Sequence, residues 1–230
     1  MIDCCSFEGT SRFFSRRASY YAMRFRLRGL DRPQRLLING LRREGFIGRS
    51  VLEVGCGVGG LHLTLLRQGA RSAIGVEASK GMLEKAIELA LEMGLEGMVQ
   101  YQQGDFVDCS STLPAASIVI MDKVLCCYAD PVRLVKAAAS HCTGLLAVTY
   151  PRGSLLSRAV FSVGAFVGTL CSSSLHPFFH DPDWLHRTVV GEGFSEVYSE
   201  TTLIWQIAVY RRVGGLESAL HAEPELLATF

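Results

Sequence analysis

Short runs of apolar residues alternate along this chain with stretches in which apolar side chains recur at helical spacing. The runs cover residues 51–54, 72–77, 98–103, 117–121 and 144–149. Unbroken hydrophobicity, clearest in the fourth run, is typical of parallel strands buried on both faces. The stretches between the runs predict helices over residues 61–67, 80–93 and 131–141. This alternation predicts a doubly wound, mostly parallel α/β sheet with helices on both faces.

The two ends of the chain depart from this alternation. Residues 194–199 and 203–210 are β-like and separated by a few residues, which predicts a C-terminal antiparallel hairpin and a seven-stranded sheet in total. A helix is expected over residues 31–44, with Asp31 as its N-cap. Around residues 13–24, aromatic and basic side chains recur at helical spacing. This amphipathic helix either covers a pocket or packs on the core through its aromatic rings.

Length and composition predict one domain with extensions. The chain has 230 residues, of which 49% are hydrophobic, enough for one good core. We expect an N-terminal helical cap over residues 1–45, a main domain over 46–213 and a weakly ordered tail over 214–230. An insertion over residues 151–180 is expected to fold over the pocket. Its serine content argues against a transmembrane span, but a buried helix or a helix in peripheral contact with a membrane would also fit.

Charge and cysteine content restrict the partners. The balance of 23 basic against 22 acidic residues gives no reason to bind nucleic acid, so a small-molecule substrate is expected, with the protein a monomer or homodimer. The start of the chain lacks the long apolar run of a signal peptide, which predicts a cytoplasmic protein with reduced thiols. None of the eight cysteines has C-x-x-C spacing, and no metal site is expected. Cys4–Cys5 and Cys126–Cys127 are the two pairs that could hold a metal or metalloid.

A glycine-rich turn after the first strand predicts a ligand-binding site. Gly55, Gly57, Gly59 and Gly60 lie between the run at 51–54 and the next helix. Glycine permits positive φ and close approach of a ligand to the backbone, and the start of a helix offers unpaired N–H groups. The spacing also satisfies the dinucleotide pattern G-x-G-x-x-G, so by itself it does not choose the cofactor.

Acids at the strand ends favour one cofactor. By strand alternation Glu53 shares a face with Gly55, where a carboxylate would repel a pyrophosphate but attract an ammonium group, unless it only caps the next turn. This favours S-adenosylmethionine over NAD(P). Glu77 ends the second strand, where it can accept both ribose hydroxyls or merely precede the next helix. Asp105 is placed to accept from an adenine amino group.

Together these motifs resemble the seven-stranded class I S-adenosylmethionine-dependent methyltransferases. The resemblance covers roughly residues 34–211 and rests on residues 51–60, 75–79 and 104–106, the strand that ends at Asp122, and the closing hairpin. A narrower resemblance to bacterial methyltransferases near the magnesium-protoporphyrin O-methyltransferases rests on three further segments. These are residues 122–130, residues 150–152 and the paired cysteines near the start.

The resemblance implies contacts for each part of the cofactor. Gly55, Gly57 and Gly59 would face the methionine part, Glu77 the ribose and Asp105 the adenine. Glu53 would orient the ammonium group through the turn. Met82 begins an apolar series that is either core or in contact with the adenine. The complete set of expected cofactor residues is Glu53, Gly55, Cys56, Gly57, Gly59, Glu77, Ala78, Met82, Asp105, Phe106 and Asp122.

The motifs say least about the residues that bind the methyl acceptor. Methyl transfer needs an acceptor atom in line behind the methyl group, and a base only if that atom keeps its proton at neutral pH. The candidate catalytic residues are Tyr128, Arg152 and His180. Arg152 could clamp a carboxylate or be a surface arginine, and His180 could be a base or a capping or core residue.

The expected reaction is methyl transfer to a carboxylate or hydroxyl oxygen of a small molecule. Two alternatives stay open. One is an NAD(P)-dependent oxidoreductase. The other is a non-catalytic cofactor-sensing or metal-binding protein that contacts a partner through Cys4–Cys5 and the insertion.

Overall fold

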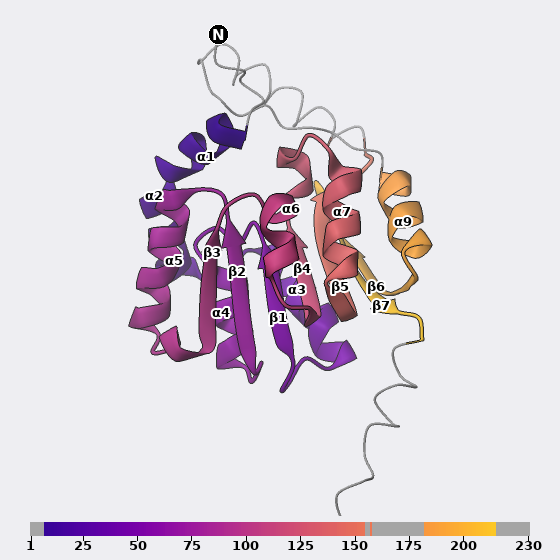
Figure 1. Cartoon of the computed structure of the whole chain (residues 1–230), viewed down its shortest axis with the longest axis horizontal. Coiled ribbons are helices and arrows are strands. Elements are labelled where there is room, and N and C mark those ends of the chain that lie inside the picture. Colours follow the sequence, from indigo (N-terminus) through magenta and orange to yellow (C-terminus); the bar gives the residue numbers. More distant parts are fainter. Residues whose placement is uncertain (1–6, 155–156, 158–181, 215–230) are drawn as a thin grey trace, which may run out of the picture.

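A seven-stranded sheet with helices on both faces forms the centre of the computed structural model, which describes residues 7–154, 157 and 182–214 (Figure 1). The strand order is β3-β2-β1-β4-β5-β7-β6, and β7 runs antiparallel to both of its neighbours while the other pairs are parallel. The strands are β1 (Ser50–Val54), β2 (Ser72–Glu77), β3 (Val99–Gln103), β4 (Ala116–Asp122), β5 (Cys142–Pro151), β6 (Phe194–Thr201) and β7 (Trp205–Arg212). The predicted doubly wound fold with its C-terminal antiparallel hairpin is confirmed.

Within the described residues, three helices precede β1, and further helices occupy most of the connections between the strands. They are α1 (Phe7–Ser15), α2 (Ala18–Arg28), α3 (Arg32–Glu44), α4 (Gly60–Arg67), α5 (Lys80–Glu92), α6 (Phe106–Cys109), α7 (Pro131–Ser140) and α9 (Pro182–Gly191). Short 3₁₀ turns cover η1 (Glu96–Met98), η2 (Ser110–Thr112) and η3 (Leu125–Cys127). None of the helices in the described part of the chain is long and apolar enough to cross a membrane.

The sheet divides the hydrophobic core in two because strand side chains alternate between its faces. Ile118 and Ile120 of β4 point into one half, with side chains of α3, α4 and α5. Val119 and Met121 point into the other, with side chains of α6, α7 and α9. Both halves are almost fully buried, which explains why β4 carries no polar residue from Ile118 to Met121.

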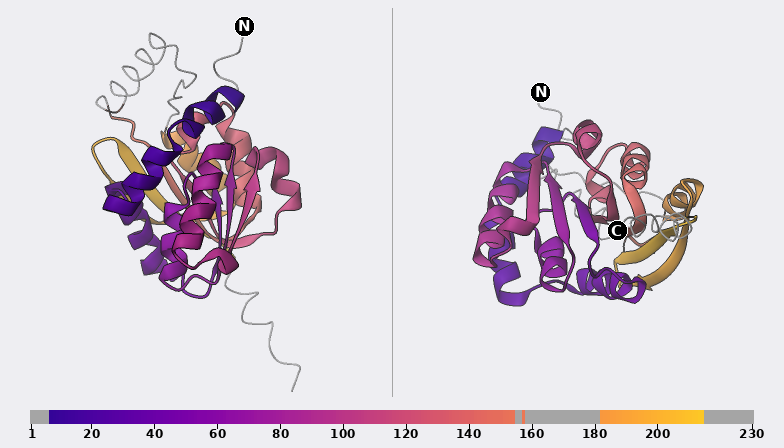
Figure 2. Two further views of the ribbon diagram at one scale, coloured as in Figure 1. Left: turned by 90° about the vertical axis from the view of Figure 1, so that its left-hand side faces the viewer. Right: turned by 60° about the horizontal axis from the view of Figure 1, so that its bottom comes forward.

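The N-terminal segment differs from the prediction of one amphipathic helix around residues 13–24. The chain turns at residues 16–17 and forms two helices, α1 and α2, which Figure 2 shows in indigo beside α5. The Ser15 hydroxyl at the end of α1 lies 2.8 Å from that of Ser79 and accepts from the Gly81 N–H at 3.2 Å. These bonds hold the end of α1 on the start of α5, so helical spacing across residues 13–24 did not mean one continuous helix.

The third N-terminal helix, α3, packs on the sheet. Asp31 caps it through a capping box with Gln34, as the D-x-x-Q pattern and Pro33 favour. Its buried Leu37 and Leu41 lie against β5, β6 and β7. Helices α1 and α2 therefore lie at the edge of the molecule, whereas α3 is one layer of the fold.

Several sequence expectations fall outside the described residues. They concern the tail from 215, most of the insertion at 151–180, Cys4, Cys5 and His180.

Gly40 offers a test of the packing between α3 and the hairpin. A Cβ at Gly40 would lie 2.5 Å from the Tyr198 ring and 2.9 Å from Val209, so Gly40→Ala should lower the free energy of unfolding by about 1–3 kcal/mol. Gly97→Ala is the matched control, because a Cβ there meets nothing within 4 Å. Denaturant unfolding of both variants measures the difference. Equal stabilities would contradict this close packing.

Candidate functional site

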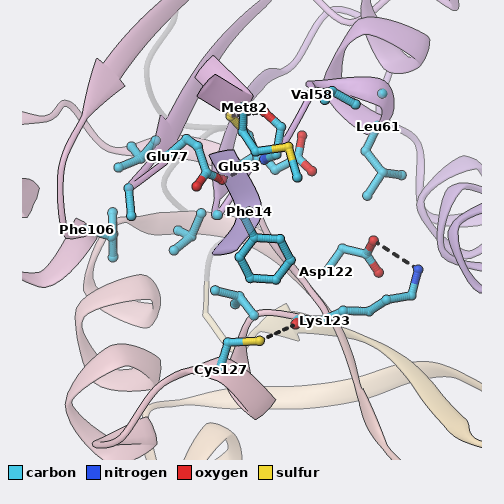
Figure 3. A pocket seen from close by; sticks show the side chains of 18 of the residues that line it. Phe14, Glu53, Val58, Leu61, Glu77, Met82, Phe106, Asp122, Lys123 and Cys127 are labelled. Carbon is cyan, nitrogen blue, oxygen red and sulfur yellow. Dashed lines mark hydrogen bonds and ion pairs between the residues drawn. The ribbon is translucent and has the colours of Figure 1, made fainter. Parts of the chain in front are cut away.

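A cavity of about 690 Å³ lies at the carboxyl ends of β1, β2 and β4 (Figure 3). Its walls come from the glycine-rich turn after β1, the end of β2, the loops after β3 and β4, and helices α1 to α3. Ligands bind in this position in open α/β sheets, where the connections on either side of the central strands diverge. The volume suits a cofactor-sized molecule.

The glycine-rich turn requires glycine for two different reasons. Gly55 and Gly57 have φ of +65° and +56°, which other residues rarely adopt. At Gly55 a Cβ would also meet Val124 at 2.7 Å, whereas at Gly57 it would meet nothing within 4 Å. Gly57 therefore leaves open space beside its backbone on the cavity wall, where a ligand can approach it.

Glu77 joins this turn to the loop after β2. One carboxylate oxygen accepts from the Gly57 N–H and the other from the Ser79 N–H, both at 2.8 Å. Burial raises the pKa of Glu77, and these backbone hydrogen bonds oppose the rise. Each oxygen keeps a lone pair for a ligand hydroxyl, because a carboxylate has about four acceptor sites.

Glu53 is tied beneath the turn by a residue that the sequence did not single out. Its Oε2 lies 2.6 Å from His62 Nδ1 and accepts from the His62 backbone N–H at 3.2 Å. His62 Nε2 lies 3.1 Å from the Tyr101 hydroxyl, which donates to the Ala86 carbonyl. Glu53 and His62 are buried, and desolvation raises the pKa of Glu53 against the influence of His62. The chain of contacts thus links β1, α4, β3 and α5 behind the cavity.

Asp105 and Tyr128 form a second polar contact across the cavity wall. The Tyr128 hydroxyl donates to the Asp105 carboxylate, at 2.9 Å from each oxygen, and the same carboxylate caps α6 by accepting from the Val107 N–H. Burial and the Asp105 charge raise the pKa of Tyr128. Phe106 and Met82 are buried nearby and line the same cavity. Tyr128 is therefore engaged with Asp105.

A network of charges lies at the other end of the cavity. Lys123 donates to Asp31 at 2.7 Å, and Arg24 approaches the same carboxylate at 3.6 Å. Burial alone would raise the pKa of Asp31, but Lys123 and the Gln34 N–H bring it below its usual value. Gln34 also donates to Asp122 Oδ2 at 2.9 Å.

Asp122 has a free acceptor beside this end of the cavity. Among the described residues its Oδ1 has no hydrogen-bond partner although the atom is buried. Lys123 follows with φ of +60°, an uncommon backbone conformation for a residue other than glycine, and its N–H donates to the Thr149 carbonyl. A buried acceptor without a donor is costly, and a bound group that donates would satisfy it.

Aromatic and sulfur-containing side chains complete the walls. Phe14 projects into the cavity from α1 between Glu77 and Asp122 (Figure 3), and Tyr21 and Trp205 also line it. Cys126 and Cys127 have their sulfur atoms 3.8 Å apart. Within the described part of the chain no group of three or more potential metal ligands occurs.

Most of the residues chosen from the sequence meet at this cavity. Those that line it are Glu53, Gly55, Cys56, Gly57, Glu77, Ala78, Met82, Asp105, Phe106, Asp122 and Tyr128. Gly59 instead begins α4, where a Cβ would meet the His62 ring at 2.9 Å. Arg152 has an exposed side chain and is not among the lining residues, although its backbone N–H donates to the Ile204 carbonyl.

Sequence reasoning missed His62, Gln34 and Lys123. The sequence identified Asp31 as the N-cap of a helix, but gave no sign that Asp31 and Gln34 both reach the cavity. His62 lies nine residues after Glu53 on another element, and no periodicity pairs them.

The Glu53–His62 pair predicts non-additive effects on stability. His62→Leu should lower the free energy of unfolding by about 3–5 kcal/mol, because it leaves a buried carboxylate without its partner. The double variant Glu53→Leu/His62→Leu should lose less than the two single variants together, since it removes both polar groups. Urea unfolding of the four proteins completes the cycle. Strictly additive losses would show that the two side chains do not interact.

Comparison with known proteins agrees with this geometry. Residues 51–146 match a family model described as a methyltransferase domain. No curated protein sequence is significantly similar to the chain.

Three solved structures illustrate the fold. Magnesium protoporphyrin IX methyltransferase from Synechocystis PCC 6803 with bound SAH (S-adenosyl-L-homocysteine) is 20% identical, with 78% of this chain and 81% of that chain covered and a TM-score of 0.65. Geranyl diphosphate C-methyltransferase from Streptomyces coelicolor A3(2) is 14% identical, with 78% of each chain covered and a TM-score of 0.62. The [4+2]-cyclase SpnF is 16% identical, with 78% and 81% covered and a TM-score of 0.62.

At these low identities the solved structures show only that the fold is similar. The family model in addition describes the matched residues as a methyltransferase domain. The matched residues 51–146 include the glycine-rich turn and the acid at the end of β2. Residues 51–146 therefore match a methyltransferase domain, and the chain has the fold of the class I S-adenosylmethionine-dependent methyltransferases.

Proposed function

We propose that this chain transfers the methyl group of S-adenosylmethionine to a small-molecule acceptor held at the Asp122–Lys123 end of the cavity. The observation that carries the proposal is the Glu77 carboxylate, fixed by the Gly57 and Ser79 N–H groups beside an open glycine-rich turn. An acid held in this position can accept the two hydroxyls of a ribose. Methyl-transfer chemistry is the contribution of the bound cofactor, and the residues of this chain position both reactants.

The cavity supports a definite order of contacts along the cofactor. Gly55 and Gly57 would lie beside the methionine part, Glu77 would accept from the ribose, and Asp105 and Phe106 would face the adenine. Met82, Ala78 and Cys56 contribute apolar wall on the same side. Glu53 would act through the turn, because its Oε2 is engaged by His62 beneath it. Gly59 would set the start of α4.

The acceptor end offers two kinds of polar group. Asp122 Oδ1 is a free acceptor for a hydroxyl or amine proton. Lys123 and Arg24 are the cations of the described cavity wall, so an acceptor carboxylate would lie beside them. Phe14, Tyr21 and Trp205 suit an apolar body. We therefore infer a small amphiphilic acceptor whose reactive oxygen faces Asp122.

This assignment revises the roles of the three candidate catalytic residues. Tyr128 would position Asp105, to which its hydroxyl donates. Arg152 has an exposed side chain, and so Lys123 and Arg24 replace it as the proposed cations. His180 lies outside the described residues and keeps its proposed role as a base.

The alternatives receive less support. The usual dinucleotide fold has the order 3-2-1-4-5-6, whereas here an antiparallel β7 lies between β5 and β6. The fold alone does not fix the reaction, since a protein described as a [4+2]-cyclase has a similar fold. Turnover measurements test the non-catalytic role. The cytoplasmic location and the monomeric or dimeric state expected from the sequence remain part of the proposal. Light scattering tests the latter.

The role of Glu77 predicts weaker cofactor binding after a near-isosteric change. In Glu77→Gln an amide NH₂ must face the Gly57 or Ser79 N–H, so the affinity for S-adenosylhomocysteine should fall by about tenfold or more. Titration calorimetry measures this change. Glu84→Gln, an exposed site on α5, should bind as the wild type does. Unchanged affinity in Glu77→Gln would place the cofactor elsewhere.

The role of Asp122 predicts a loss of turnover with cofactor affinity retained. Asp122→Asn keeps the shape of the side chain but removes the carboxylate that would accept the proton of the methyl acceptor. The value of kcat should therefore fall by about a hundredfold. The acceptor is first found by mass spectrometry of a metabolite extract incubated with methyl-labelled S-adenosylmethionine. If Asp122→Asn instead loses affinity for S-adenosylhomocysteine while kcat holds, Asp122 belongs to the cofactor site. Absence of any labelled product despite cofactor binding would favour the non-catalytic alternative.

A further inference from the structure

Helix α2 is apolar on two opposite faces. Its inner face packs Ala22 in the core and places Tyr21 and Phe25 on the cavity wall. A surface helix normally carries polar residues on the face turned away from the core. On α2 that outward face is apolar as well, and it lies along the edge of the molecule (Figure 2).

The outward face consists of Tyr20, Met23 and Leu27, which we name the outer α2 stripe. These side chains are 66%, 53% and 75% exposed. Their spacing of three and four residues aligns them on one side of the helix. None of the three lines the cavity. Single exposed apolar residues are common, but an aligned set on one helix marks an interaction surface.

Positive charge accompanies the stripe. Residues 9–30 contain six arginines and no acid, although the whole chain carries a formal charge of only +1. The six are Arg12, Arg16, Arg17, Arg24, Arg26 and Arg28. Arg16 and Arg28 are exposed and have no carboxylate partner among the described residues. The surface around the stripe is therefore basic.

Acidic groups next to the stripe are already paired. Helix α5 packs beside α2 and contains Glu84, Glu88 and Glu92. Glu92 forms an ion pair with Arg26 at 2.5 Å. Glu84 and Glu88 pair with Lys80 and Lys85 of their own helix. These pairs reduce the repulsion that the acids would exert on an anionic surface.

We propose that the outer α2 stripe docks on the surface of an anionic lipid bilayer. Apolar side chains on an arginine-rich helix insert at the boundary between headgroups and acyl chains, while the arginines bind lipid phosphates. Three side chains bury too little area for a stable protein dimer, which needs about 800 Å² from each partner. A small apolar area combined with unpaired arginines fits weak, reversible binding that depends on anionic lipid.

This surface has a consequence for the acceptor, which rests on the proposed function. The same helix carries the stripe outside and Tyr21, Arg24 and Phe25 on the cavity wall. A bilayer bound by the stripe would therefore lie one helix away from the cavity wall. The acceptor class inferred here is therefore a lipophilic amphiphile.

Vesicle sedimentation tests the docking surface with the full chain. Two vesicle types are used, phosphatidylcholine alone and phosphatidylcholine with an equal part of phosphatidylglycerol. The wild type should bind only the second type, and binding should weaken as salt is added. The Met23→Glu/Leu27→Glu variant should bind at least about tenfold more weakly. Ile47→Glu is the matched control, because Ile47 is 77% exposed and precedes the amino end of β1, whereas the cavity lies at the carboxyl end.

Three results would overturn the proposal. They are equal binding to both vesicle types, equal binding by the wild type and the double variant, and a change in oligomeric mass rather than lipid binding in the double variant. The last would make the stripe an interface between copies of the chain. Calorimetry with S-adenosylhomocysteine on the same preparations separates this test from the proposed function, since the double variant should bind it as the wild type does.

Discussion

The two hydrogen bonds that the Glu77 carboxylate accepts hold the site together. The bond from Gly57 joins the turn after β1 to the end of β2, where the Cys56 N–H also donates to the Val76 carbonyl, and the bond from Ser79 orders the loop after β2. Burying a carboxylate is expensive unless donors replace the lost water, and here two backbone N–H groups do so. The shape of the glycine-rich turn therefore depends on a residue of the neighbouring strand. The cavity forms where the sheet brings these two strand ends together.

The position of helix α1 also depends on the loop that follows Glu77. Ser11 donates to the Ala78 carbonyl, and Ser15 contacts Ser79 and Gly81. A Cβ at Gly81 would lie 2.9 Å from the Ser15 carbonyl oxygen, so the helix approaches this loop closely. The segment that places Phe14 in the cavity thus rests on the residues that directly follow Glu77. Helix α1 and the loop after β2 therefore form one connected unit.

The sequence predicted the strands, the glycine-rich turn and the acids at strand ends, because each is encoded by neighbouring residues. The apolar run before Asp122 and the N-cap at Asp31 are examples. It did not predict contacts between distant elements, such as Lys123 with Asp31 or Tyr128 with Asp105. Nothing in local periodicity records such pairs. For the same reason Arg152 seemed suited to the acceptor, although its side chain points to solvent.

Asp31 has two tasks that a single substitution cannot separate. It caps α3 through the Gln34 N–H, and it holds Lys123 at the acceptor end of the cavity. Loss of a helix cap costs about 0.5–2 kcal/mol, so a change at Asp31 that altered the choice of acceptor would also weaken the fold. Phe14 and Tyr21 line the same cavity, and neither side chain caps a helix. Divergence toward new acceptors is accordingly easier through the aromatic wall than through the charged one, and we expect evolution to have explored the former first.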